Sequence, residues 1–152
     1  MTSRVFLDTN ILVYSVDADE PEKRKTALRI LRGEDSRFRD STWVVSTQVL
    51  QEFYVTAVRK LHRPLTGEIA EAAVQRLARL TVIAIDTDLV VDAIAMSRAH
   101  SLSLWDSLIV RAALRGGCDV LLTEDLPDGQ VFERTTLQDP FATGDSITRP
   151  SD

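Results

Sequence analysis

The sequence of 152 residues is long enough for one domain with a substantial core, and its 44% hydrophobic and 27% charged residues are ordinary for a globular protein. The formal charge of −5 argues against a simple polyanion binder, unless a bound cation reverses the sign locally. No apolar run approaches the roughly 18 residues of a membrane span, and the first residues do not resemble a signal peptide. Because Cys118 is the only cysteine, an internal disulfide is excluded, and this favours the reducing cytoplasm.

The first predicted element is a buried strand over residues 5–7, which Asp8 ends abruptly. Thr9 and Asn10 follow at once, so a polar cluster stands at the end of an apolar run. One interpretation is structural, because Asp8 or Asn10 can cap a following helical segment and stabilise it by roughly 1 kcal/mol. The other is functional, because ligands of open α/β sheets bind at the carboxyl ends of parallel strands.

Residues 21–31 are predicted to form a helix with Pro21 in its first turn and Gly33 beyond its end. Lys25, Arg29 and Arg32 fall on one face of this helix. A row of charges is usually a solvated surface, and the alternative is a surface that contacts phosphates.

Residues 43–45 are predicted to form the second strand, and Ser46 or Thr47 can cap the next helix. Apolar residues at helical spacing extend that helix to Leu61. Glu52 lies on its polar flank, in the second turn, where its carboxylate can lean back toward Asp8. A glutamate on an amphipathic helix is more often simply solvated.

The middle of the chain is predicted to contain a helix over residues 66–80 capped by Thr66, a strand over residues 82–85, and a helix over residues 87–99 capped by Thr87. The strand is the clearest one in the sequence. His100 is expected in a surface loop.

The next predicted helix opens at residues 103–107, and the glycine pair at 116–117 stops it. Asp106 lies in the first turn, which acids favour because of the helix dipole. Trp105 beside it is large enough to form the wall of a pocket or can simply pack. A strand over residues 118–122 then leads into Thr123, Glu124 and Asp125, a second acidic cluster at a strand end, where an aspartate alone would suggest a turn.

A turn at 127–129 and a short edge strand at 130–132 complete the expected elements, and residues 142–152 are predicted to be a flexible tail after a single domain over residues 1–141. The alternation of strands and helices predicts an α/β fold whose parallel sheet is covered on both faces.

Four carboxylates are therefore expected at one rim of the sheet: Asp8, Glu52, Asp106 and Asp125. They would repel one another unless a cation neutralised them. Oxygen ligands without a nearby His or Cys favour Mg²⁺ or Mn²⁺, which can polarise a phosphate and activate water. No Ser, Cys or His constellation suggests a covalent mechanism.

Residues 6–10, Glu52 within residues 47–53, residues 103–107 and residues 122–126 resemble the ordered motifs of the PIN-domain nucleases, and more narrowly of VapC toxins, along residues 5–141. The resemblance implies a three-layer α/β/α sandwich and an endoribonuclease that acts as the toxin of a toxin–antitoxin pair. It implies that Asp8, Glu52, Asp106 and Asp125 hold Mg²⁺ or Mn²⁺, and that Asn10 and Thr123 orient them or the attacking water. It also implies a homodimer and a VapB-like antitoxin. Glu124 adjoins Asp125, which leaves open which of the two faces the metal.

Three other classes share parts of this pattern. A phosphoacceptor receiver domain needs a late lysine, whereas the only lysines are Lys23, Lys25 and Lys60. A haloacid-dehalogenase-like phosphatase would have an aspartate where Asn10 stands. A catalytically silent PIN-like module that binds RNA or protein remains an alternative, and such a module should take up little Mg²⁺ or Mn²⁺.

Overall fold

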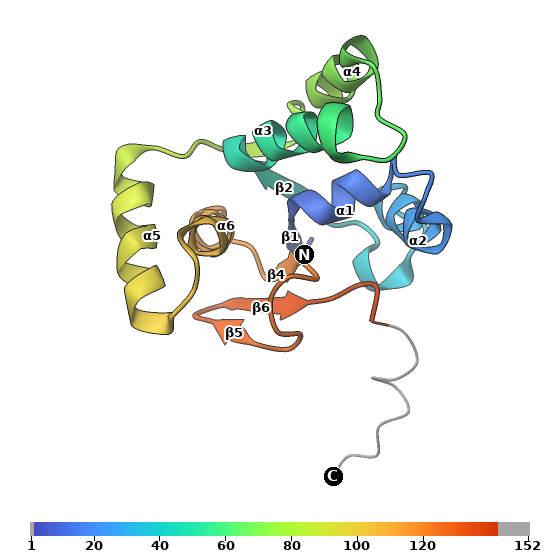
Figure 1. Ribbon diagram of the computed structural model, residues 1–152. Helices are drawn as coiled ribbons and strands as arrows, with labels where there is room; N and C mark the ends of the chain where they lie inside the picture. Colours follow the sequence, from blue (N-terminus) through green and yellow to red (C-terminus); the bar gives the residue numbers. More distant parts are fainter. Residues whose placement is uncertain (1, 143–152) are drawn as a thin grey trace.

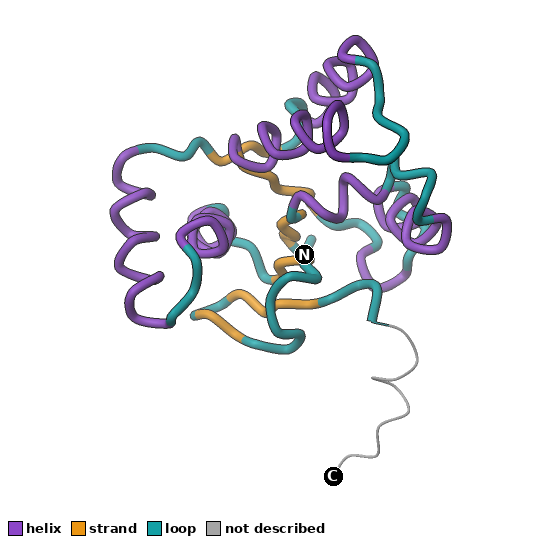
Figure 2. The backbone as a smooth tube through the Cα atoms, in the orientation of Figure 1, coloured by secondary structure: helices purple, strands orange, loops and turns teal. Residues whose placement is uncertain are grey.

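The computed structural model describes residues 2–142 and shows a mostly parallel six-stranded sheet between helices (Figures 1 and 2). The strands are β1 (Arg4–Leu7), β2 (Thr42–Ser46), β3 (Thr81–Ile83), β4 (Val120–Leu122), β5 (Val131–Phe132) and β6 (Thr135–Gln138). The helices are α1 (Thr9–Tyr14), α2 (Pro21–Leu31), α3 (Thr47–Val55), α4 (Gly67–Leu77), α5 (Thr87–His100) and α6 (Leu104–Arg115), with a short 3₁₀ turn η1 (Ser36–Phe38) and a π-helical turn η2 (Thr56–Lys60).

The strand order β3-β2-β1-β4-β6-β5 places β1 in the middle of the sheet. β2 pairs with β1 on one side and β4 pairs with it on the other, both in parallel, and only β5 runs antiparallel to its neighbour. The chain order therefore reverses between β1 and β4. In open α/β sheets a crevice for ligands forms outside the carboxyl ends of the strands at such a reversal.

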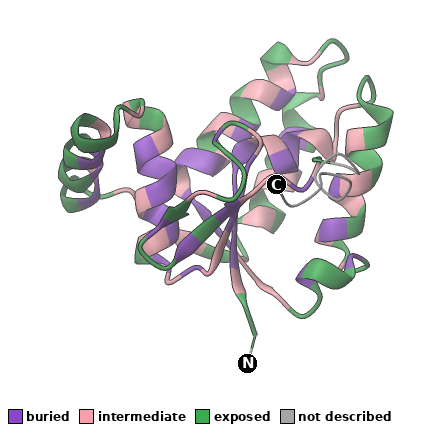
Figure 3. Cartoon of the chain, turned by 90° about the horizontal axis from the view of Figure 1, so that it is seen from below, coloured by how far each residue is buried: buried purple, intermediate pink, exposed green. Residues whose placement is uncertain are grey.

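Helices flank the sheet in two groups, as Figure 1 shows. α5 and α6 pack against each other on one side, and α1 packs against α2 and α3, with α4 beside α3, on the other. Figure 3 shows the buried residues along the central strands and on the helix faces that meet them. Phe6, Leu7, Ile11, Phe53 and Leu121 are among the largest fully buried side chains. The expected α/β sandwich is confirmed.

Most predicted elements are found, and the differences have physical reasons. The helix after β2 does not run regularly to Leu61, because from Thr56 it widens into a π turn in which the Leu61 amide donates to the Thr56 carbonyl. Asp86 rather than Thr87 is the N-cap of α5, since its carboxylate accepts from the Leu89 amide at 2.9 Å.

The third strand is shorter and more exposed than its apolar sequence suggested. β3 spans Thr81–Ile83 at one edge of the sheet, and none of its residues is buried. His100 is not in a loop but ends α5, where its ring meets the Phe132 ring edge to face with centroids 5.4 Å apart. Cys118 is buried and lies just before β4 rather than in it.

The last strand was not predicted. β6 has a single large apolar residue, Leu137, and lies between β4 and β5, the short antiparallel strand at the edge. Thr135 is buried there because its hydroxyl donates to the Cys118 carbonyl at 2.7 Å. No helix within residues 2–142 combines the length and apolar character needed to cross a membrane. The flexible tail is predicted for residues 142–152, and all of these except residue 142 lie outside the described residues.

Candidate active site

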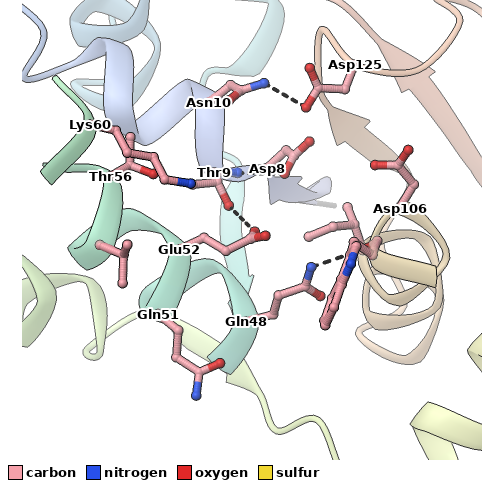
Figure 4. Close-up of a pocket in the computed structure, with 13 residues that line it drawn as sticks. Asp8, Thr9, Asn10, Gln48, Gln51, Glu52, Thr56, Lys60, Asp106 and Asp125 are labelled. Atoms are coloured by element: carbon pink, nitrogen blue, oxygen red, sulfur yellow. Dashed lines mark hydrogen bonds between the residues drawn. The ribbon is translucent and has the colours of Figure 1, made fainter. Parts of the chain in front are cut away.

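A cleft of about 360 Å³ opens where β1, α3, α6 and the loop after β4 meet (Figure 4). All four predicted metal ligands line it, and so does Asn10. The remaining lining residues come from the starts of α1 and α6 and from one side of α3 and η2, and they are Thr9, Gln48, Gln51, Val55, Thr56, Lys60, Trp105 and Ile109. The fold thus gathers carboxylates from four separate parts of the chain.

Asp8 lies at the bottom of the cleft and is 6% exposed. It is also the N-cap of α1, so the structural and functional interpretations of this residue hold together. Burial raises the pKa of Asp8 from 3.8 to about 7, and the charges of Asp125 and Glu52 add to that rise. Hydrogen bonds from the Thr123 hydroxyl at 2.7 Å and the Thr9 amide at 2.7 Å lower the pKa in part.

Thr123 does not line the cleft, because it is fully buried beneath it. Its hydroxyl donates to Asp8 and accepts from the Asp125 amide at 3.1 Å. Thr123 can therefore orient these two acids, whereas its burial keeps it away from an attacking water. The side-chain amide of Asn10 donates to the Asp125 carboxylate at 2.8 Å and so helps to orient it.

Glu52 is placed by α3, which starts directly after β2 with Ser46 as its N-cap. The Ser46 hydroxyl accepts from the Val49 amide at 3.3 Å, and this bond sets the first turn. In the second turn the Glu52 carboxylate accepts a hydrogen bond of 2.8 Å from the Thr9 hydroxyl, as Figure 4 shows. Glu52 therefore leans toward the end of β1, as expected.

Asp106 enters the cleft from the first turn of α6. The Ser103 hydroxyl caps this helix by accepting from the Asp106 amide at 3.0 Å. Gln48 ties the same turn to α3, since its side-chain amide donates to the Trp105 carbonyl at 3.3 Å. Figure 4 shows the Asp106 carboxylate on the far side of the cleft from Glu52.

The four acids have the chemistry of a cation site. None of the ion pairs among the described residues involves any of them. Burial raises the pKa of Asp125, and the charges of Asp106, Glu124 and Glu52 add to this effect. Within residues 2–142 no three His, Cys, Asp or Glu side chains already lie at metal-binding spacing. The all-oxygen donor set fits Mg²⁺ or Mn²⁺ once the carboxylates are drawn together.

Glu124 belongs to a different environment from Asp125. Its carboxylate accepts hydrogen bonds from the Tyr14 hydroxyl and from the Lys23 ammonium, the latter at 3.0 Å. Lys23 also lies 4.8 Å from the centre of the Tyr14 ring. Asp125, not Glu124, lines the cleft. The structure therefore shows that Asp125, and not Glu124, faces the cleft.

Sequence reasoning did not find Lys60 or the hydrogen bond from Thr9 to Glu52. The signal for Lys60 was its spacing, because Gln48, Glu52, Thr56 and Lys60 follow one another at every fourth position and all line the cleft. The basic residues of α2 that were considered as phosphate contacts are exposed and lie outside the cleft lining: Lys25, Arg29 and Arg32.

The family model of the PIN domain matches residues 5–126. The chain belongs to the PIN domain family. This match confirms the resemblance carried by the four motifs, each of which lies within the matched segment. No significant match to a curated protein sequence is found.

Solved structures of VapC and related toxin–antitoxin proteins share the fold. A toxin–antitoxin complex from Klebsiella pneumoniae has a TM-score of 0.63 at 20% identity, covering 90% of this chain and 98% of that chain. VapC20 of Mycobacterium tuberculosis, a toxin that cleaves the sarcin–ricin loop, has a TM-score of 0.58 at 20% identity, covering 80% and 91%. DNA-bound VapBC from Salmonella typhimurium has a TM-score of 0.57 at 20% identity, covering 92% and 99%.

Proposed function

We propose that this PIN domain is a Mg²⁺- or Mn²⁺-dependent endoribonuclease and the toxin of a toxin–antitoxin pair. The observation that carries the proposal is the cleft lined by Asp8, Glu52, Asp106 and Asp125, none of which forms an ion pair with another described residue. Four carboxylates in one partly buried cleft are unfavourable unless a cation joins them. A catalytically silent binding module would not need four unpaired carboxylates in one cleft.

The protein's own residues have distinct roles in this proposal. Asp8, Glu52, Asp106 and Asp125 would hold the ion, with the buried Asp8 as the principal ligand. A divalent ion bound there supplies polarisation of a phosphodiester and activation of water for attack on phosphorus. Thr123 fixes Asp8 and the backbone of Asp125, and Asn10 fixes the Asp125 carboxylate. These hydrogen bonds keep the acids directed into the cleft before substrate arrives.

The toxin role rests on the shared fold. Solved structures with this fold include a toxin that cleaves the sarcin–ricin loop and complexes of toxins with antitoxins. By analogy, RNA is the substrate, a VapB-like antitoxin is the inhibitory partner, and the active form is a homodimer.

The decisive experiment compares RNA cleavage by the wild type, Asp8→Asn and Asp106→Asn in Mg²⁺ or Mn²⁺. We expect the wild type to cleave, and each variant to lose cleavage while keeping the circular dichroism and cooperative unfolding of the wild type. Asp92→Asn is a matched control, because this exposed aspartate lies on α5 away from the cleft.

Full activity of either variant, or of the wild type in excess EDTA, would overturn the assignment. Calorimetric titration with Mn²⁺ separates the proposal from the silent module, since a silent module should show little uptake at millimolar concentrations. Expression in bacteria provides a test of the toxin role: the wild type should arrest growth, and Asp8→Asn should not.

A further inference from the structure

Trp105 is the most exposed large aromatic side chain of the cleft. The residue is 63% exposed and lines the cleft directly beside Asp106. The other tryptophan, Trp43, is half-buried in β2 and packs against the core. An exposed indole contributes little to the folded core, and aromatic residues at such positions are enriched in binding sites. Packing therefore does not account for Trp105.

The backbone that carries Trp105 is fixed from two sides. Ser103 caps the helix turn in which it lies, and Gln48 donates to its carbonyl from α3. The position of the indole relative to Asp106 is thus set by α6 and by its link to α3. Stacking of a ligand on this ring would therefore not carry the entropy cost of ordering a flexible loop.

Gln48 provides an independent sign of a ligand. It is only 7% exposed and lines the cleft, yet its Oε1 has no hydrogen-bond partner among the described residues. Buried polar atoms are almost always paired, so this unpaired acceptor beside the cleft is an unusual feature of the site.

Lys60 supplies the opposite charge on the other side of the same cleft. Figure 4 shows Glu52 and Asp8 between Lys60 and Asp106. Lys60 ends the π-helical turn η2 and makes no ion pair with another described residue. Irregular turns of this kind occur frequently at functional sites. A cation and an aromatic ring thus line the same cleft as the group of acids.

We propose that Trp105 stacks on an unpaired nucleobase next to the scissile phosphate, while Lys60 contacts a neighbouring phosphate on the other side of the acids. The proposal rests on the ribonuclease function, and it requires an unpaired base, because a base inside a duplex cannot reach an aromatic platform. RNA fits better than a protein partner, since the ring, the unpaired Gln48 acceptor and Lys60 all adjoin the acids that would act on a phosphodiester.

The test uses Trp43→Phe, in which Trp105 is the only tryptophan. A short unstructured RNA and the same strand without bases are titrated in Ca²⁺, which serves as a non-catalytic divalent ion. We expect the RNA to quench the Trp105 fluorescence and the abasic strand to leave it unchanged. Trp105→Ala should bind the RNA about 5- to 100-fold more weakly and the abasic strand equally well, because stacking acts through the base alone. Trp105→Phe should keep most of the affinity.

Two further variants sharpen the result. Lys60→Met should weaken binding of both strands and reduce the salt dependence by about one phosphate contact. Ile94→Ala removes an exposed apolar side chain of α5 outside the cleft and should change neither affinity.

The possible failures are distinguishable. If the wild type cleaves RNA but Trp105→Ala binds it unchanged without quenching in the single-tryptophan protein, the stacking proposal is wrong and the ring belongs to a protein-docking surface. If base-dependent quenching occurs without metal-dependent cleavage, the stacking proposal stands and the nuclease function fails. If no RNA binds, both are overturned.

Discussion

Glu124 and Asp125 are adjacent in the chain, yet the fold surrounds them differently. Lys23 and Tyr14 bind the Glu124 carboxylate, and these interactions raise the pKa of Lys23. Asp125 lines the cleft with three other acids, and its pKa is raised by burial and by the charges of Asp106, Glu124 and Glu52. The Glu124 carboxylate forms an ion pair with Lys23, whereas none of the four cleft acids forms an ion pair with another described residue. The difference supports the proposal that the cleft takes up a cation from solution.

The largest expected effect separates these two neighbours by activity. Asp125→Asn should lower metal-dependent RNA cleavage by at least about 100-fold, because it removes a proposed ligand of the ion. Glu124→Gln, the matched control one residue away, should stay within a few-fold of the wild type. Initial rates at saturating Mn²⁺ measure both. Equal losses in the two variants would contradict the division between a functional and a structural acid.

The pH dependence of folding tests the buried charge of Asp8. Its pKa is about 7 in the folded protein and near 3.8 when unfolded, so the folded state binds more protons between these values. The metal-free protein should therefore lose stability as pH rises from about 4 to 7, by up to roughly 4 kcal/mol. Asp8→Asn should largely remove this loss, and so should added Mn²⁺. Denaturant unfolding in EDTA at several pH values measures it. An unchanged slope in Asp8→Asn would show that Asp8 is not the source.

The Glu124 cluster should contribute to stability rather than to metal binding. Lys23→Met removes the ion pair with Glu124 and the cation–π contact with Tyr14. The side chains of Lys23 and Glu124 are 37% and 20% exposed, so solvent screens much of the ion pair. We expect a loss of about 1 kcal/mol in free energy of unfolding. Calorimetric Mn²⁺ uptake should not change. A variant that loses Mn²⁺ uptake while remaining folded would place this cluster in the site.

The smallest effect is expected from the basic face of α2. Triple replacement of Lys25, Arg29 and Arg32 by alanine should weaken RNA binding and make its salt dependence shallower if these residues contact phosphates. Affinity measured over a range of salt concentrations provides the test. An unchanged slope would make this face ordinary solvated surface.

Local sequence patterns were sufficient to predict most elements and the convergence of the acids, because Asp8 and Asp125 follow strands and the other two acids lie in the first two turns of helices. Asp8 is an example in which a capping position and a cleft position coincide, because it is the N-cap of α1 and also lines the cleft. The partner of Glu124 could not be predicted, since Lys23 lies 101 positions away and nothing local links them. β6 was missed because a strand held by pairing and a buried threonine has little apolar signature.

The most direct test of the central claim is the anomalous scattering of Mn²⁺ in crystals grown with that ion. We expect density among the carboxylates of Asp8, Glu52, Asp106 and Asp125, with Glu124 still bound to Lys23. Manganese density at Glu124, or four cleft acids that remain apart with no density between them at millimolar Mn²⁺, would contradict it.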